Sequence, residues 1–247
     1  MDGSNQNREL VARAVDELFV TKDLGAVDRY FAEPYLQHNP LLPSGLKAFR
    51  ELAQGAIVGN PGFKAARLCA LADGELVAVH HRYIGLGPVP FMAVDLFRVQ
   101  DGKVVEHWDC LQEETPESDR HCAELAKLND TRRPDNAERH RAAVTSFIET
   151  TWVGSFSDDD GKRWGPPPHG TERLISSPGT RQDPLRYARV HRILADGNLV
   201  LTQSEAATRG QTYVCYDLFL VEGDVVIRYW SLAQGVPSSS VSGLGMF

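Results

Sequence analysis

The stretch from Phe91 to Leu111, FMAVDLFRVQDGKVVEHWDCL, decides the fold. Apolar residues alternate with others on both sides of Asp101-Gly102, a dipeptide typical of tight turns. The pattern predicts two antiparallel strands over 90–99 and 103–112. We expect a three-residue loop over 100–102, which would pair Val99 with Lys103 and Asp95 with His107, and would place Ala93 opposite Asp109.

Side chains alternate across a strand, so this hairpin has two different faces. One face is expected to carry Asp95, His107 and Asp109 together with Phe91, Phe97, Val105 and Leu111. The opposite face would carry Met92, Val94, Leu96, Val104 and Trp108. Carboxylates and an imidazole on an apolar face are costly unless they are paired or used. Both faces therefore need a covering layer, and the polar group marks a candidate site.

Composition excludes several classes of protein. The 247 residues are 42% hydrophobic, which is enough for a folded core, and the formal charge of -7 argues against nucleic acid or an anionic membrane as partner. No apolar run could span a bilayer, and the polar start does not resemble a signal peptide. Four cysteines without CxxC spacing are expected to be reduced thiols, so we expect a cytoplasmic protein.

The period of the apolar residues changes once along the first half. Helical spacing over 5–22, 24–31 and 46–57 is followed by strand-like spacing over 63–72, 75–84, 90–99 and 103–112. A polar loop is expected over 35–40, ahead of the third helix. Three helices followed by a curved antiparallel sheet predict an α+β domain.

The second half repeats the first. LADGELV at 71–77 recurs as LADGNLV at 194–200, with Asn for Glu, and Asp95-Leu96-Phe97 recurs as Asp217-Leu218-Phe219. Trp108 recurs as Trp230 at a matching offset. We interpret this as a tandem duplication. The expected domains are 1–114 and 136–237, with a linker over 115–135 that includes a helix near 117–128, and a flexible tail over 238–247.

The segments YLQHNPLLPSGLKAF (35–49) and MAVDLFRVQDGKVVEHWD (92–109) resemble the SnoaL-like polyketide cyclases of the nuclear transport factor 2-like superfamily. The resemblance covers about 8–112 and implies a cone, in which a bent sheet wraps around helices and encloses an apolar pocket. Dimerisation through the outer sheet face is also implied. We therefore expect the two halves to pack as an internal pseudo-dimer, and a homodimer stays open.

The resemblance implies that Asp109 is a general acid/base, with Asp95 and His38 as further polar positions. The cyclases carry histidine where this chain has Asp95, so the proton pathway need not be shared. Burial would raise the pKa of Asp109 and let it deliver a proton at neutral pH. His107 is expected to orient an aspartate. The expected pocket lining is Tyr35, His81, Tyr83, Phe91, Phe97 and Trp108.

Three functions remain open at this point. The first is a cofactor-independent enzyme that cyclises, isomerises or dehydrates a small oxygenated metabolite. The others are a binding module without chemistry and a hydrolase of epoxides or lactones. His38, His81, His107, Asp95 and Asp109 are acceptable metal ligands, but no short ligand spacing occurs and the resemblance implies no metal. Ser231 and Tyr229 stand where Asp109 and His107 would be, so we expect activity in the first half only.

Overall fold

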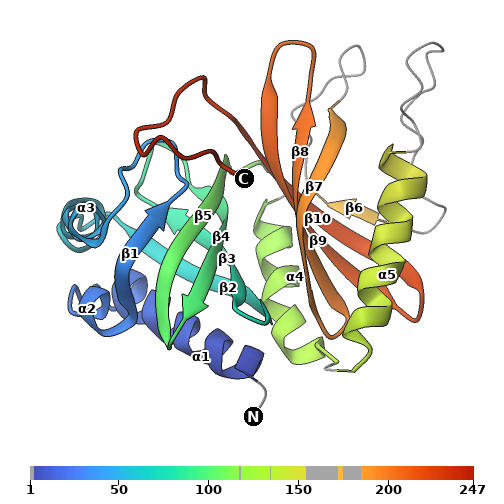
Figure 1. The fold of residues 1–247 in the computed structure, drawn as a ribbon, viewed down its shortest axis with the longest axis horizontal. Coiled ribbons are helices and arrows are strands. Elements are labelled where there is room, and N and C mark those ends of the chain that lie inside the picture. The colour runs from blue at the N-terminus through green and yellow to red at the C-terminus, as the bar shows by residue number, and fades with distance from the viewer. Residues whose placement is uncertain (1–2, 117, 134, 154–171, 175–184) are drawn as a thin grey trace. The chain divides into compact units, whose positions relative to one another are not determined.

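The computed structural model describes residues 3–116, 118–133, 135–153, 172–174 and 185–247. The chain forms two compact units. The first contains residues 1–130 and 236–247, and the second contains residues 131–235. Each unit has its own five-stranded sheet and its own core (Figure 1).

Three helical segments of the first unit precede its antiparallel strands, as the periodicity predicts. They are α1 (Gly3–Val15) with a π-helical end η1 (Asp16–Val20), α2 (Ala26–Tyr30), and α3 (Leu46–Leu52) with η2 (Ala53–Val58). The strands are β1 (Phe31–Gln37), β2 (Lys64–Asp73), β3 (Leu76–Ile84), β4 (Phe91–Gln100) and β5 (Lys103–Glu113). The order in the sheet is β1-β5-β4-β3-β2.

The hairpin of β4 and β5 differs from its expected register. Asp101 and Gly102 both have positive φ, 50° and 71°, so the loop has two residues and Gln100 pairs with Lys103. A bulge follows, because Val99 pairs with Val104 while Arg98 pairs with Glu106. Asp95 therefore lies opposite Asp109, and Phe97 lies opposite His107. The bulge also turns Val104, not Val105, into the core.

Strand β1 was missed by the sequence analysis, which expected a polar loop over 35–40. Residues 31–37 instead run parallel to β5, where Leu36 pairs with Glu106 and Gln37 pairs with His107. Pro34 lies in a stretch where the pairing register shifts, between Phe31 and Leu36. A proline is tolerated at such an edge because its missing N–H breaks no regular ladder there. The strand ends at Gln37, and a loop begins at His38.

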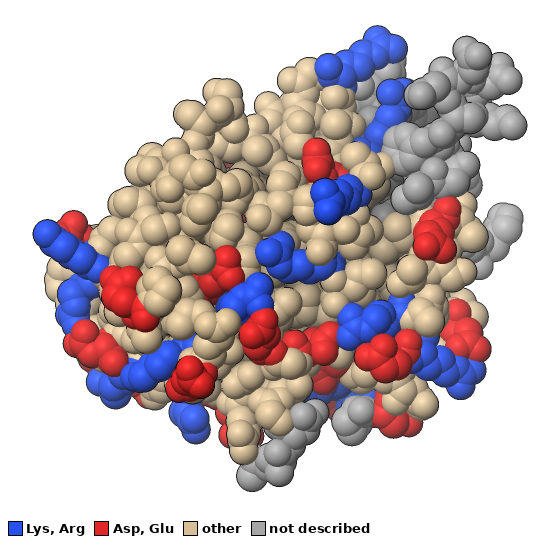
Figure 2. Space-filling view, in the orientation of Figure 1, with Lys and Arg blue, Asp and Glu red and all other residues tan. Residues whose placement is uncertain are grey.

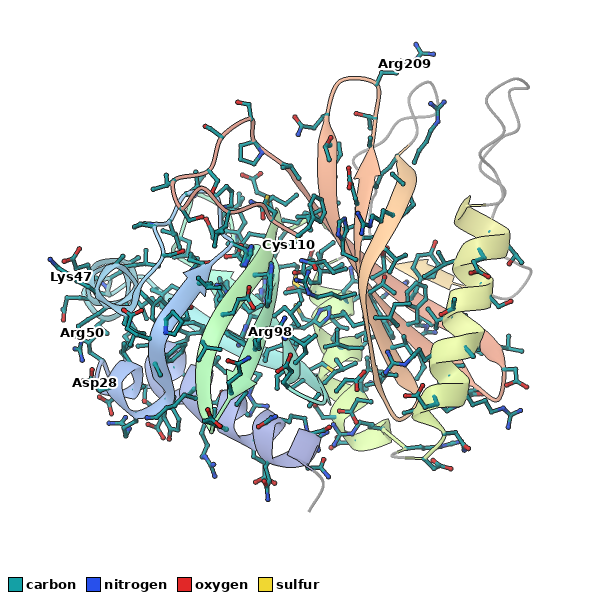
Figure 3. The ribbon with its side chains drawn as sticks, in the orientation of Figure 1. Asp28, Lys47, Arg50, Arg98, Cys110 and Arg209 are labelled. Carbon is teal, nitrogen blue, oxygen red and sulfur yellow. The ribbon has the colours of Figure 1, made fainter. Side chains whose placement is uncertain are left out.

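Helices cover the inner face of the first sheet, and one helix packs on its other face. The inner core joins apolar residues of α1, α2 and α3 to alternate residues of the strands, among them Val77, Ala93 and Phe97. An exposed ion pair between Asp28 and Arg50 links α2 to α3 (Figure 3). Helix α4 (Ser118–Thr131), expected near 117–128, contacts β2 through Asn129, whose Nδ2 donates to the carbonyl of Leu68 at 2.7 Å.

The second unit has the same strand order. It contains α5 (Ala137–Ile148), η3 (Glu149–Val153), β6 (Glu172–Leu174), β7 (Arg186–Asp196), β8 (Leu199–Ala207), β9 (Thr212–Glu222) and β10 (Val225–Gly235). The sheet order is β6-β10-β9-β8-β7. Ser231 pairs with Asp217, as Asp109 pairs with Asp95 in the first unit. Asp217 accepts hydrogen bonds from Ser231 and, at 2.9 Å, from the Tyr187 hydroxyl.

Charged side chains of both signs are interleaved on the face drawn in Figure 2. This mixture matches the balanced composition and gives that face no extended field of one sign. None of the helices in the described ranges is long and apolar enough to cross a membrane.

Candidate active site

A cavity of about 210 Å³ opens inside the first unit. Its walls are mostly apolar, from Phe19, Leu41, Leu42, Phe49, Leu52, Ala56, Ile57, Phe63, Leu86 and Leu111. Its polar side chains are Gln37, Asn39, Tyr83, Asp95, His107 and Asp109. An apolar cavity with a few converging polar groups is the usual form of a small-molecule site.

Asp95 is the most heavily hydrogen-bonded carboxylate in the site. Its Oδ2 accepts from His81 Nδ1 at 2.8 Å and from the Tyr83 hydroxyl at 2.7 Å, and its Oδ1 contacts His107 Nε2 at 3.0 Å. Burial by itself would raise the pKa of Asp95, but the hydrogen bonds from His107 and His81 outweigh it and hold that pKa well below its usual range. Asp95 is therefore a fixed anion.

The protonation of His107 follows from its neighbours. The backbone N–H of Asn39 donates to Gln37 Oε1 at 2.9 Å, which fixes the orientation of that amide. His107 Nδ1 lies 3.0 Å from this same oxygen and must therefore donate to it. Its Nε2 faces the anion of Asp95, so both ring nitrogens carry hydrogen. Burial opposes this charge, but the hydrogen bond to Asp95 raises the pKa of His107 above its usual value.

Asp109 lies opposite Asp95 and has a different environment. Asn39 Oδ1 accepts from the backbone N–H of Leu41, so its Nδ2 donates to Asp109 Oδ2 at 2.7 Å. Asp109 Oδ1 is buried and has no hydrogen-bond partner within the described part of the chain. Burial raises the pKa of Asp109 to about 6, against the opposing charge of His107. The site thus contains one carboxyl group that can gain or lose a proton near neutral pH.

The structure brings together only part of the expected site. Asp95, His107, Asp109 and Tyr83 line the cavity. His81 lies behind them and contacts Asp95. Phe97 stacks on His107 with ring centroids 4.9 Å apart, and Phe91 packs at the edge of the core.

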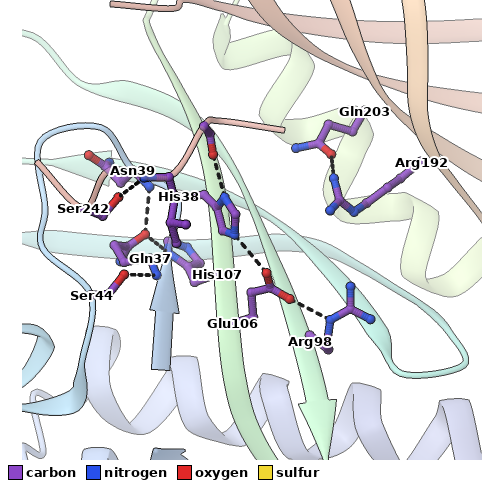
Figure 4. Close-up of polar contacts among 12 residues, drawn as sticks. Gln37, His38, Asn39, Ser44, Arg98, Glu106, His107, Arg192, Gln203 and Ser242 are labelled. Atoms are coloured by element: carbon purple, nitrogen blue, oxygen red, sulfur yellow. Dashed lines mark hydrogen bonds and ion pairs between the residues drawn. The ribbon is translucent and has the colours of Figure 1, made fainter. Parts of the chain in front are cut away.

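Three of the expected residues lie elsewhere. His38 points to the other face, where its ring stacks on Trp108 with ring centroids 4.6 Å apart. Its Nε2 lies 2.9 Å from Glu106 Oε1 (Figure 4). Neither His38 nor Trp108 lines the cavity. His38 follows Gln37 and Trp108 follows His107, and successive side chains of an extended segment point to opposite faces. Tyr35 is 1% exposed and packs between Phe31 and Phe49 instead of lining the cavity.

One family of known domains matches part of the first unit. Residues 11–107 match the family of SnoaL-like domains, and no curated protein matches the chain. Residues 11–107 are a SnoaL-like domain. The stretch includes β1, the hairpin to His107 and most of the cavity wall, whereas Asp109 follows two residues beyond its end.

Three solved structures that are similar to the chain each correspond to less than half of it. An NTF2-like protein of unknown function from Mesorhizobium loti is 25% identical, with a TM-score of 0.41, and covers 45% of this chain and 95% of its own. A putative SnoaL-like polyketide cyclase from Jannaschia sp. is 20% identical, with a TM-score of 0.39 and coverages of 45% and 89%. IdmH from Streptomyces antibioticus, a putative polyketide cyclase, is 20% identical, with a TM-score of 0.37 and coverages of 43% and 92%.

Two residues of the SnoaL-like domain that hydrogen-bond His107 and Asp109 are not among the site residues predicted from the sequence. Gln37 and Asn39 flank His38, and their side chains reach His107 and Asp109. His38, which lies between them, is the more obvious candidate in the sequence because imidazoles are common acid/base groups. The sequence does hold a signal for the two amides. If residues 31–37 form a strand, side chains alternate along Gln37-His38-Asn39, so Gln37 and Asn39 share one face and His38 lies on the other.

The same cluster in the SnoaL-like domain has the composition of a cation site. Asp95, His107 and Asp109 each offer a ligand atom, and these atoms lie within 4.8 Å of one another. Carboxylate and imidazole ligands suit zinc, iron and manganese. Gln37 would then orient His107 by the hydrogen bond it already accepts. Removal of metal therefore tests whether this cluster holds a cation.

Proposed function

We propose that the SnoaL-like domain is a cofactor-independent enzyme that moves a proton at a small, uncharged, oxygenated metabolite. Asp109 is the general acid/base. The reactions that suit it are ring closure by aldol condensation, isomerisation through an enol, and dehydration. Each needs one proton removed from a carbon, or delivered to an oxygen, that the cavity holds in place.

The observation that carries this proposal is the state of Asp109 Oδ1. It is a buried carboxylate oxygen with no protein partner among the described residues, in a cavity whose walls are mostly apolar. The other oxygen, Oδ2, accepts from Asn39, so the carboxyl group is oriented and Oδ1 remains available to a substrate. A pKa of about 6 leaves most of Asp109 ionised at pH 7 and lets it take and return a proton.

The ion pair of Asp95 and His107 has a supporting role. All its hydrogen-bonding atoms are engaged with His81, Tyr83 and Gln37 or with each other. The pair therefore does not compete with Asp109 for the proton, and the positive charge of His107 stabilises negative charge that develops beside it.

The lining indicates the class of substrate. Among the described residues around the cavity there is no Lys or Arg, and the imidazolium of His107 is already paired with Asp95, so a carboxylate or phosphate would have no free counter-ion. We infer an uncharged, mainly apolar molecule with one or two oxygen atoms. We assign the reaction to the first unit, because Ser231 of the second unit pairs where Asp109 does and has no acidic group.

The test uses 2-tetralone, an uncharged bicyclic ketone with acidic hydrogens beside its carbonyl. In D₂O the protein should catalyse exchange of these hydrogens, followed by NMR. Asp109→Asn should lower the rate by about 10²–10⁴-fold, the usual contribution of a general base. Asp101→Asn, the same change at an exposed turn residue, is the control and should exchange at the wild-type rate.

Two other outcomes would replace the proposal. Hydrolysis of styrene oxide that depends on Asp109, without ketone exchange, would assign the site to an epoxide hydrolase. Binding of the neutral fluorophore 2-naphthol in the cavity, with neither reaction, would assign it to a binding module.

A further inference from the structure

Residues 236–247, which follow β10 in the chain, belong to the first compact unit. We call this segment the strap. It contains no helix or strand, yet Met246 is only 2% exposed. The serine- and glycine-rich sequence predicts a flexible tail here. The strap instead lies on the loop that leaves β1, with the backbone N–H of Val241 donating to the carbonyl of Pro40 at 2.9 Å.

The His38 side chain contacts the strap directly. Its Nδ1 contacts the carbonyl oxygen of Gly245 at 2.5 Å, and its Nε2 contacts Glu106 Oε1 at 2.9 Å (Figure 4). Glu106 lies on β5 and also accepts from Arg98 Nε on β4 at 2.7 Å. One side of the imidazole is thus anchored to the sheet, and the other side holds the strap.

The backbone connects this contact to the cavity. His38 lies between Gln37 and Asn39, the two residues whose amides hold His107 and Asp109. Successive side chains point to opposite sides, so one segment carries the strap on one side and the catalytic groups on the other. The backbone N–H of His38 also donates to the carbonyl of His107 at 2.9 Å, which fixes the segment against β5.

We propose that His38 is a positioning residue, which ties the strap to the loop and thereby holds Gln37 and Asn39 against His107 and Asp109. The strap is rich in serine and glycine, so its ordering depends on a few contacts. When it detaches, residues 38–42 lose their outer support and the two amides lose alignment. Docking of the strap is independent of the chemistry proposed above, and its effect on turnover rests on that chemistry.

Two variants separate the bonds of His38. In His38→Asn the amide nitrogen takes the place of Nδ1 and keeps the bond to Gly245. In His38→Gln it takes the place of Nε2 and keeps only the bond to Glu106. Both variants lose the ring that stacks on Trp108. Their difference therefore isolates the strap contact.

Hydrogen exchange is measured first, on the full chain. His38→Gln should speed exchange in residues 236–247 and 38–42 by about tenfold or more, whereas His38→Asn should stay near wild type. Met246→Ala truncates a buried side chain of the strap and leaves the His38 side chain unchanged, and it should have the same effect as His38→Gln. Equal exchange in His38→Gln and His38→Asn, or no change in Met246→Ala, would overturn the docking.

The effect on the site is measured in two ways. The titration midpoint of His107, followed by NMR, should fall by about half a pH unit in His38→Gln and Met246→Ala as Gln37 loses its alignment. The kcat for exchange of 2-tetralone should fall by about tenfold to a hundredfold. KM should rise by a smaller factor, because Leu41 and Leu42 lie in the loosened loop while the other apolar walls are unchanged. If the strap detaches and His107 does not shift, the positioning role is wrong. If the wild type does not exchange the hydrogens of 2-tetralone, the proposed function alone is rejected. The titration of His107 by NMR would still test the positioning role.

Discussion

Asp95 and Asp109 lie directly opposite each other on β4 and β5, yet they differ in proton affinity. Burial acts on both. Hydrogen bonds from His107 and His81 hold the pKa of Asp95 well below its usual range, whereas burial raises the pKa of Asp109 to about 6. Their surroundings separate the two pKa values, so Asp95 stays charged while Asp109 can carry a proton. The predictions below follow from this division.

Asp109→Asn should stabilise the folded protein at neutral pH. Folding raises the pKa of Asp109 from 3.8 to about 6, so the folded state binds the proton more tightly than the unfolded state. This group therefore lowers stability as pH rises from about 4 to about 6, by up to about 3 kcal/mol. Urea unfolding should show a gain for the variant at pH 7 that shrinks at pH 4. A pH-independent difference would contradict the raised pKa.

The rate of ketone exchange should depend on pH through Asp109. Because the carboxylate form removes the proton, kcat/KM for 2-tetralone should rise with pH and level off, with a midpoint near the pKa of about 6. A flat profile between pH 5 and 8, in the wild type, would assign proton removal to another group.

Asp95→Asn should destabilise the first unit. The change removes the anion that His107 and His81 contact and leaves the buried imidazolium of His107 uncompensated. Breaking a buried ion pair from one side costs about 3–5 kcal/mol. Asp101→Asn, at the exposed turn, should stay within about 0.5 kcal/mol of wild type. Denaturant unfolding of both variants measures the difference, and equal stability would argue against the ion pair.

Gln37 should control the charge of His107. Its Oε1 accepts from His107 Nδ1, so Gln37→Leu removes this acceptor and should lower the pKa of His107. Gln37→Glu replaces it with an anion and should raise that pKa. The measurement is the ¹⁵N chemical shift of the ring nitrogens against pH. Two protonated nitrogens are expected in the wild type at pH 7, and a neutral ring would refute the deduced protonation.

Removal of metal should leave catalysis intact. The ligand atoms of Asp95, His107 and Asp109 lie close enough to hold a cation, but the proposed proton transfer needs none. After dialysis against a chelator, the rate of ketone exchange should match that of untreated protein. Loss of exchange that zinc, iron or manganese restores would assign the cluster to a metal centre instead.

Local pattern predicted the helices and the antiparallel strands of the first unit, and it failed for one hairpin register and for one parallel strand. Alternation over 91–111 predicted β4 and β5 and put Asp95, His107 and Asp109 on one face. The register was wrong because a two-residue turn and a bulge near Val104 replace the expected three-residue loop. Strand β1 was missed because a parallel edge strand has no partner nearby in sequence.

The sequence by itself determined the α+β class, the order of the helices and antiparallel strands of the first unit, the SnoaL-like resemblance, and Asp109 as the candidate acid/base. Residue type and periodicity suffice for the class and the order of elements, since they act over a few neighbours. The candidate role of Asp109 is what the resemblance implies. Only the tertiary structure decided that Asp95 and His107 form an ion pair, that Gln37 and Asn39 hold the site, and that His38 faces the strap. Proton affinity and hydrogen-bond partners depend on groups far apart in the chain, which only folding brings together.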